Sequence, residues 1–198
     1  MSGIKHSITD GEEMPPRYRL NKTVALVGMM GAGKTAVGRA VSAKLGAPFL
    51  DSDAEIEAAA NLSVPEIFTR DGEPFFRKRE TEVIARLLAE ERCILSTGGG
   101  AFLAEVNRDN IGAYGVALWL DADLDLLWNR VRYKDSRPLL RTADPKATLT
   151  ALYRDRVPLY RLADLSVRCD PRLSIDAMAN RVIDKLLTRP DVLEKLDA

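Results

Sequence analysis

A glycine-rich segment between residues 24 and 39 constrains the fold of this chain more than any other feature. An apolar run ends at Val27, and the loop that follows carries glycines at 28, 31 and 33 before Lys34 and Thr35. This is the pattern G-x-x-x-x-G-K-[ST], in the order strand, loop, helix that the pattern requires. Such a loop turns backbone N–H groups around a phosphate chain, at the positive end of the following helix. The segment therefore predicts a nucleoside triphosphate site.

The side chains of this segment predict how the triphosphate is held. Lys34 is expected to reach the β- and γ-phosphates, and the Thr35 hydroxyl is expected to ligate Mg²⁺. The alternative is a chance glycine turn between strand and helix, which four fixed positions in the right context disfavour. The expected nucleotide-binding residues of the segment are Gly31, Ala32, Gly33, Lys34, Thr35 and Ala36.

Composition narrows the possible chemistry. The 198 residues suit one domain, 46% of them are hydrophobic, and the formal net charge of zero favours neither nucleic acid nor an acidic membrane as a partner. The single histidine is His6, in a polar start of the chain. A catalytic base should therefore be a carboxylate, Lys, Tyr or Cys. Cys93 and Cys169 have no metal or disulfide spacing and are interpreted as two buried thiols. No apolar run reaches membrane-spanning length and no signal segment is evident, so a cytoplasmic protein is expected.

Apolar runs alternate with helical patterns along the chain, which predicts a parallel α/β sheet with covered faces. A flexible N-terminal tail is expected over 1–20, one domain over 21–189, and a C-terminal tail over 190–198. The polar, basic stretch 133–144 breaks the helical periodicity and is interpreted as a lid. Expected strands are Thr23–Val27, Pro48–Asp51, Cys93–Ser96, Gly115–Leu120 and Leu165–Arg168. Expected helices are Lys34–Leu45, Asp53–Ala60, Val64–Thr69, Phe75–Glu90, Ala122–Arg132, Pro145–Leu162 and Ser174–Leu187.

Polar residues and glycines follow the second and third expected strands. Asp51 and Asp53 are two residues apart, so both carboxylates can face one site at the carboxyl edge of the sheet. The alternative is a helix cap at Ser52 or Asp53. The next strand runs into Gly98-Gly99-Gly100, where backbone N–H groups can approach a ligand closely. A flexible turn is the alternative there.

Basic residues supply the complementary charge. Arg77 follows two aromatic residues and precedes Glu80 by three positions, a pattern typical of a partly buried guanidinium held by a carboxylate. Asp121 ends an apolar strand and admits two interpretations, a metal ligand or the cap of the helix Ala122–Arg132. The cap is favoured, because Asp51 already offers a carboxylate for Mg²⁺.

Together these residues resemble the shikimate kinase family. The resemblance extends from about Thr23 to Leu187, and its later motifs are more specific than the phosphate loop. The matching segments are Gly28–Thr35, Asp51-x-Asp53, Glu66-Ile67-Phe68, Asp71-Gly72-Glu73, Phe76-Arg77 with Glu80, Gly98-Gly99-Gly100, Arg137-Pro138-Leu139-Leu140 and Arg156-x-Pro158-Leu159-Tyr160.

The resemblance implies a fold and an activity. The fold is a P-loop, nucleoside-monophosphate-kinase-like three-layer α/β structure, with a five-stranded parallel sheet in the order 2-3-1-4-5 and a mobile lid. The activity is ATP-dependent phosphorylation of the 3-hydroxyl of shikimate to shikimate 3-phosphate, in the pathway to chorismate and the aromatic amino acids. The implied ligands are ATP, Mg²⁺ and shikimate, and the implied state is a monomer.

The resemblance also implies roles for individual residues. Asp53 would orient the shikimate hydroxyls and accept a proton, with Lys34 and Arg137 as the other catalytic residues. Asp51 would join Thr35 around Mg²⁺. The carboxylate of shikimate would bind Arg77, Arg156 and the Gly99 N–H. Gly98 and Gly100 would shape the pocket. Phe68 and Phe76 would pack on the ring. Arg130 and Arg172 would lie near the adenine, and Arg137 would also contact the nucleotide.

Two other functions remain open from the sequence. A gluconate kinase of similar fold would share the phosphate loop, but it has no evident need for two arginines on the substrate carboxylate combined with Asp51-x-Asp53. A nucleotide switch or ATPase module would use Asp121 as its metal-binding residue. An assay with several acceptors separates these possibilities.

Overall fold

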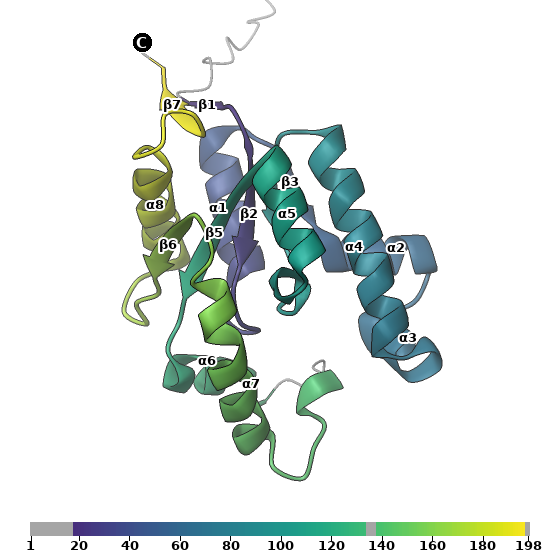
Figure 1. Ribbon diagram of the computed structural model, residues 1–198. Helices are drawn as coiled ribbons and strands as arrows, with labels where there is room; N and C mark the ends of the chain where they lie inside the picture. Colours follow the sequence, from purple (N-terminus) through teal and green to yellow (C-terminus); the bar gives the residue numbers. More distant parts are fainter. Residues whose placement is uncertain (1–17, 134–137, 197–198) are drawn as a thin grey trace, which may run out of the picture.

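A computed structural model describes residues 18–133 and 138–196 of the chain (Figure 1). Its centre is a five-stranded sheet in which every neighbouring pair of strands is parallel, in the order β3-β4-β2-β5-β6. The strands are β2 (Thr23–Val27), β3 (Phe49–Asp51), β4 (Ile94–Ser96), β5 (Gly115–Asp121) and β6 (Leu165–Arg168). Numbered among themselves, these strands have the order 2-3-1-4-5, which confirms the predicted fold class.

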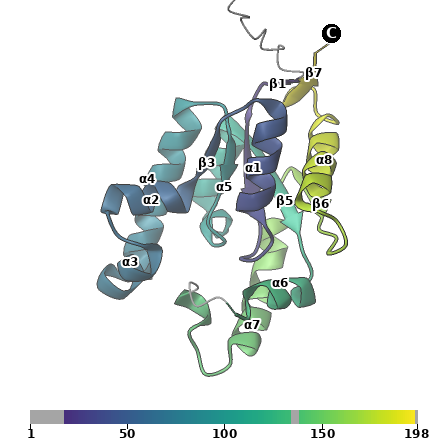
Figure 2. The same cartoon turned by 180° about the vertical axis from the view of Figure 1, so that it is seen from behind.

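Helices cover both faces of this sheet. α1 and α8 lie together on one face, while α4 and α5 lie on the other, as the two opposite views show (Figures 1 and 2). The central strand β2 is buried along its whole length, as expected for a parallel strand covered on both faces. The helices are α1 (Lys34–Leu45), α2 (Ser52–Ala60), α3 (Val64–Asp71), α4 (Glu73–Glu90), α5 (Glu105–Tyr114), α6 (Leu124–Val131), α7 (Pro145–Tyr160) and α8 (Ile175–Leu186), with 3₁₀ turns η1 (Ala101–Leu103) and η2 (Pro138–Leu140).

The predicted elements agree with the observed ones within two residues at each end, but helix α5 was not predicted. Its buried residues are Asn107 and Ile111, which leaves too weak an apolar periodicity to detect. The amide of Asn107 donates to the Ala101 carbonyl at 2.9 Å, so the helix is fixed to η1 partly by a polar contact.

The interpretation of Asp121 as a helix cap is wrong. Strand β5 continues through Asp121, which pairs in register with Arg168 of β6 and accepts a hydrogen bond from its guanidinium at 2.9 Å. The chain is still extended at this point. The cap of α6 is Asp123, whose side chain accepts from the Leu126 N–H at 2.8 Å.

The segments predicted as tails include the two strands of a second sheet. β1 (Tyr18–Leu20) pairs antiparallel with β7 (Leu193–Lys195), so the ends of the expected tails 1–20 and 190–198 meet beside α1 and α8 (Figure 1). An ion pair between Lys22 and Asp191, at 2.9 Å, reinforces the contact. Neither strand was predicted, because each has a charged residue at its centre, Arg19 in β1 and Glu194 in β7, and so forms no apolar run. Residues 1–17 and 197–198 of these tails lie outside the described residues.

The C-terminal segment is docked through apolar side chains, because Val192 and Leu193 are buried. We expect Leu193→Ala to lower the free energy of unfolding by about 3 kcal/mol, as truncation of a buried leucine usually does. Leu196→Ala is the matched control, since Leu196 is exposed, and it should cost about 0.5 kcal/mol or less. Urea unfolding followed by circular dichroism measures both. Equally small effects of the two substitutions would contradict the docking.

The segment predicted as a lid, 133–144, is described only in part. Residues 134–137 lie outside the described residues, and Pro138–Leu140 form η2, after which Asp144 caps α7. In the described ranges, 18–133 and 138–196, no helix has the length and apolar character needed to cross a membrane.

Candidate functional site

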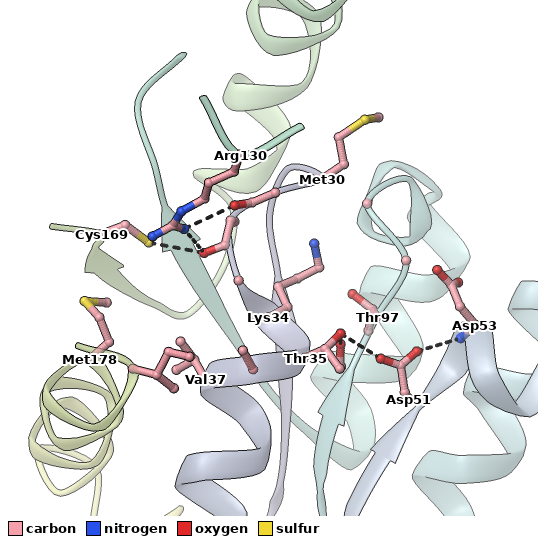
Figure 3. Close-up of a pocket in the computed structure, with 18 of the residues that line it drawn as sticks. Met30, Lys34, Thr35, Val37, Asp51, Asp53, Thr97, Arg130, Cys169 and Met178 are labelled. Carbon is pink, nitrogen blue, oxygen red and sulfur yellow. Dashed lines mark hydrogen bonds between the residues drawn. The ribbon is translucent and has the colours of Figure 1, made fainter. Parts of the chain in front are cut away.

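The glycine-rich loop lines a cavity of about 420 Å³ at the carboxyl ends of β2, β3 and β4. Figure 3 shows this cavity, with Met178 at one end and Asp51 and Asp53 at the other. The apolar end is lined by Val37, Cys169, Leu173, Ile175 and Met178, and the polar end by Asp51, Asp53, Ser96 and Thr97. One end therefore suits a flat apolar group, and the other suits phosphate groups and a cation.

The backbone of the loop is shaped for an anion. Gly28, Gly31 and Gly33 have φ values of 135°, 84° and 98°, in the region that favours glycine. A Cβ atom on Gly31 would also lie 2.7 Å from Cγ1 of Val131, so a side chain does not fit. Helix α1 starts directly after Gly33 without a side-chain cap, so its first N–H groups remain available to a bound phosphate.

Lys34 brings a positive charge into this loop. Its ammonium group donates to the carbonyls of Gly28 and Met29 at 2.8 and 3.0 Å, and the residue is buried. The flexible lysine side chain can turn from these carbonyls towards a phosphate chain in the same loop.

Oxygen atoms from three elements meet beside Lys34. The Thr35 hydroxyl donates to Asp51 Oδ2 at 2.9 Å and lies 3.2 Å from the hydroxyl of Ser96 (Figure 3). Asp51 also caps α2, because its Oδ1 accepts from the N–H groups of Asp53 and Ala54. The alternative of a cap at Ser52 or Asp53 is therefore one or two residues too late. Asp51 serves as both cap and site residue.

This cluster fits Mg²⁺, which prefers oxygen ligands, keeps several waters and is bound by few carboxylates together with substrate phosphates. Among the described residues there is no group of three or more His, Cys, Asp or Glu side chains that could hold a metal ion. A cation at Thr35 and Asp51 would therefore depend on the nucleotide for part of its coordination.

A second cavity, of about 70 Å³, adjoins the first. Met30, Asp53, Gly98 and Gly99 line both cavities, so Asp53 stands at their boundary. The eight residues expected to bind the acceptor all line the second cavity: Asp53, Phe68, Phe76, Arg77, Gly98, Gly99, Gly100 and Arg156. Val64, Glu80, Pro138 and Leu139 complete the wall.

Arg77 is held in this cavity by two acidic residues. Its guanidinium donates to Glu80 at 2.8 Å and to Glu73 at 2.8 and 3.1 Å, and it lies over the rings of Phe68 and Phe76. Burial lowers the pKa of Arg77, but Glu80 and Glu73 outweigh this effect and raise it. The guanidinium is thus a fixed positive charge.

Glu80 is completely buried, and burial raises the pKa of its carboxyl group although Arg77 opposes the shift. Its Oε1 has no hydrogen-bond partner among the described residues. A Cβ atom on Gly98 would lie 2.4 Å from this oxygen and 2.8 Å from Asp53 Oδ1. A glycine is therefore required at position 98 by the close approach of two carboxylates.

Arg156 reaches the cavity from a different helix. It is a buried residue of α7, and its guanidinium donates to the Gly99 carbonyl at 3.5 Å. Arg156 and Arg77 thus approach the same glycine turn from two helices, as a site for an anionic group requires.

Comparison with known proteins identifies the family. The family model for shikimate kinase matches residues 30–187. The shikimate kinase of Ruegeria pomeroyi is 69% identical over 175 residues, which cover 88% of this chain and 90% of that protein. The chain belongs to the shikimate kinase family. The shikimate kinase of Cereibacter sphaeroides is 60% identical over 176 residues, covering 89% of this chain and 88% of the relative.

Solved structures agree with this family membership. A shikimate kinase from Acinetobacter baumannii in complex with shikimate superposes with a TM-score of 0.81 at 36% identity, covering 84% of this chain and 93% of that one. A gluconokinase from Sinorhizobium meliloti gives a TM-score of 0.57 at 17% identity, covering 87% of this chain and 95% of that one. The second likeness shows the shared fold alone.

The structure does not bring every residue expected from the family to the two cavities. Arg130 lines the nucleotide cavity and donates to the carbonyls of Gly31 and Ala32 at 3.2 and 3.1 Å. Arg172 does not line it. The Arg172 side chain is 86% exposed and pairs with Asp170 at 2.9 Å. Arg137 lies outside the described residues, so its expected roles stay predictions.

Sequence reasoning missed several cavity residues. Ser96 could have been noted, because it ends the strand before the glycine triplet and lies level with Asp51 in the neighbouring strand. Cys169, Leu173, Ile175 and Met178 come from the loop after β6 and from α8. No local motif distinguishes these apolar residues from residues of the hydrophobic core. Both cysteines are buried free thiols, as predicted.

Proposed function

We propose that this chain transfers the γ-phosphoryl group of ATP to the 3-hydroxyl of shikimate and forms shikimate 3-phosphate, a step towards chorismate and the aromatic amino acids. The observation that carries the proposal is the position of Asp53 at the boundary of a phosphate-binding cavity and a cavity with two arginines. A carboxylate at that boundary can contact an acceptor hydroxyl that faces the γ-phosphate.

The donor binds in the larger cavity. The loop N–H groups of Gly31, Ala32, Gly33 and Ala36, with Lys34, hold the phosphates, and the adenine lies towards the apolar end with Met178. Thr35 and Asp51 hold Mg²⁺, which when bound neutralises phosphate charge. Arg172 would contact the adenine after its ion pair with Asp170 opens.

The acceptor binds in the smaller cavity. Arg77, Arg156 and the Gly99 N–H bind its carboxylate, Phe68 and Phe76 pack on its ring, and Gly98 and Gly100 leave space for it. This arrangement fixes the carboxylate at one end of the ring and the reacting hydroxyl at the other, beside Asp53. A neutral sugar would offer no negative charge to the two guanidinium groups and should bind poorly.

Positioning and charge account for the reaction. Asp53 orients the 3-hydroxyl and accepts its proton as the hydroxyl oxygen bonds to the γ-phosphorus and the bond from that phosphorus to the bridging oxygen of ADP breaks. Lys34 and the start of α1 stabilise the charge that develops on the phosphate oxygens. Closure of 133–144 would bring Arg137 to the transferred group and exclude water.

The remaining expectations are proposed on separate grounds. We propose a monomer, as the resemblance to the family implies, with one kinase domain over about 21–189 to which β1 and β7 add a second sheet. We propose the cytoplasm as the location of the protein, because ATP is available there as the phosphoryl donor. The neutral net charge supports no nucleic acid or membrane partner.

One assay separates this function from its rivals. ADP release is measured with ATP and Mg²⁺ in the presence of shikimate, of gluconate, or of no acceptor. We expect release with shikimate alone. Release with gluconate would favour a gluconate kinase, and equal release without an acceptor would favour an ATPase or switch. The switch also required Asp121 as a metal ligand, whereas Asp121 pairs with Arg168.

A further inference from the structure

Tyr160 is a buried polar residue next to the acceptor cavity that the proposed reaction does not use. It is the last residue of α7, it is 0% exposed, and it lies four positions after Arg156. Residues four apart on a helix share a face, so both side chains point towards the glycine turn. The ring of Tyr160 stacks on Trp119 of β5, with 6.3 Å between ring centroids. Apolar packing therefore fixes the ring without help from the hydroxyl.

The hydroxyl group makes a specific contact. It donates a hydrogen bond to the Gly99 carbonyl and lies 3.8 Å from Met29 Sδ of the phosphate loop. Burial raises the pKa of Tyr160 to about 12, although the neighbouring Arg156 opposes the shift. The hydroxyl is therefore protonated at neutral pH and available as a donor.

The Gly99 carbonyl thus accepts from two groups of the same helix, Tyr160 and Arg156. The peptide bond is planar, so fixing the Gly99 carbonyl also fixes the direction of the Gly100 N–H. On the other side of this peptide, a Cβ atom on Gly100 would lie 2.5 Å from Cζ of Arg77. The Gly99–Gly100 peptide is therefore the spacer between the two guanidinium groups.

We propose that Tyr160 is a positioning residue for the acceptor, whose hydroxyl anchors the Gly99–Gly100 peptide so that Arg77 and Arg156 stay at the separation that one carboxylate requires. The inference rests on the proposed function, because it assumes an acceptor with a carboxylate. Without the hydroxyl, the Gly99 carbonyl lacks its closer donor and draws the Arg156 guanidinium away from the substrate. A buried carbonyl left short of a donor is costly, so this displacement is favourable.

Tyr160→Phe tests the proposal, because it removes one oxygen and keeps the ring on Trp119. We expect KM for shikimate to rise by roughly tenfold, the effect of one lost hydrogen bond to a charged or buried group. KM for ATP and kcat at saturating shikimate should change less than about twofold. Tyr153→Phe is the matched control, since Tyr153 is a half-buried residue of the same helix outside both cavity walls.

A binding measurement distinguishes positioning from a general structural effect. The Kd values of shikimate and of its carboxamide analogue are measured by calorimetry for the unmodified chain and for Tyr160→Phe. We expect the substitution to weaken shikimate and leave the carboxamide unchanged, because the carboxamide does not use the charge of the two arginines. The proposal would be overturned if the substitution weakened the binding of both ligands equally, or if it weakened the binding of neither. If the unmodified chain bound no shikimate, the proposed function would fail, and this inference with it.

Discussion

Asp53→Asn should lower kcat for shikimate phosphorylation by about three orders of magnitude, within the usual range for loss of a general base. Asparagine has nearly the same shape and can still orient a hydroxyl, but its amide cannot accept the proton. ATP affinity should change little, because the loop N–H groups and Lys34, rather than Asp53, hold the phosphates in the proposed complex. Single-turnover kinetics give the rate of the chemical step, and calorimetry gives the affinity for ATP.

Glu55→Gln is the control for Asp53→Asn. It removes one negative charge from the same helix, but Glu55 pairs with Arg86 on the surface. It should leave kcat unchanged. Turnover of Asp53→Asn near the rate of the unmodified chain would show that another group accepts the proton, or that none is needed.

The donor half of the site could be predicted from local sequence. Gly28 to Thr35 determine their own geometry, since positive φ values at three glycines and a helix starting at Lys34 depend on adjacent residues. The same holds for α1, whose predicted and observed bounds coincide. Short-range patterns were sufficient wherever the ligand is bound by backbone N–H groups of one loop.

The acceptor half depends on contacts between segments far apart in sequence. The resemblance to the family identified the residues of the acceptor half. Their sequence positions alone do not show that Glu80 is completely buried or that Gly98 packs on two carboxylates. Tyr160 appeared only as the last letter of a motif. Its contact with Gly99 spans 61 positions and has no local signal.

The incorrect or missing predictions also concern contacts between segments far apart in sequence. Asp121 and Asp123 are equally good caps by composition, and only the pairing of β5 with β6 decides between them. The pairing of β1 with β7 joins the two ends of the described chain. Residue preferences act over a few positions, so they locate α-helices and buried strands better than contacts of this range.

Arg77→Ala should raise KM for shikimate by about a hundredfold and leave KM for ATP nearly unchanged. Three of the five guanidinium N–H groups of Arg77 bind Glu73 and Glu80, which leaves two without a partner among the described residues. Two N–H groups in a fixed fork match one carboxylate, and loss of a partly buried charged partner of this kind typically costs a factor of that order. Arg79→Ala is the control, because Arg79 pairs with Glu82 on the exposed side of the same helix.

The effect of Arg77→Ala has a second possible cause, which a double variant separates. Removal of Arg77 leaves the Glu80 carboxylate buried without its opposite charge, and an uncompensated buried charge typically costs about 3–5 kcal/mol. Glu80→Gln in the Arg77→Ala background removes that charge, so stability should recover in urea unfolding. KM for shikimate should stay high, because the fork that binds the carboxylate is still missing. Recovery of KM together with stability would mean that Arg77 serves the fold of the cavity and that Arg156 binds the acceptor carboxylate without it.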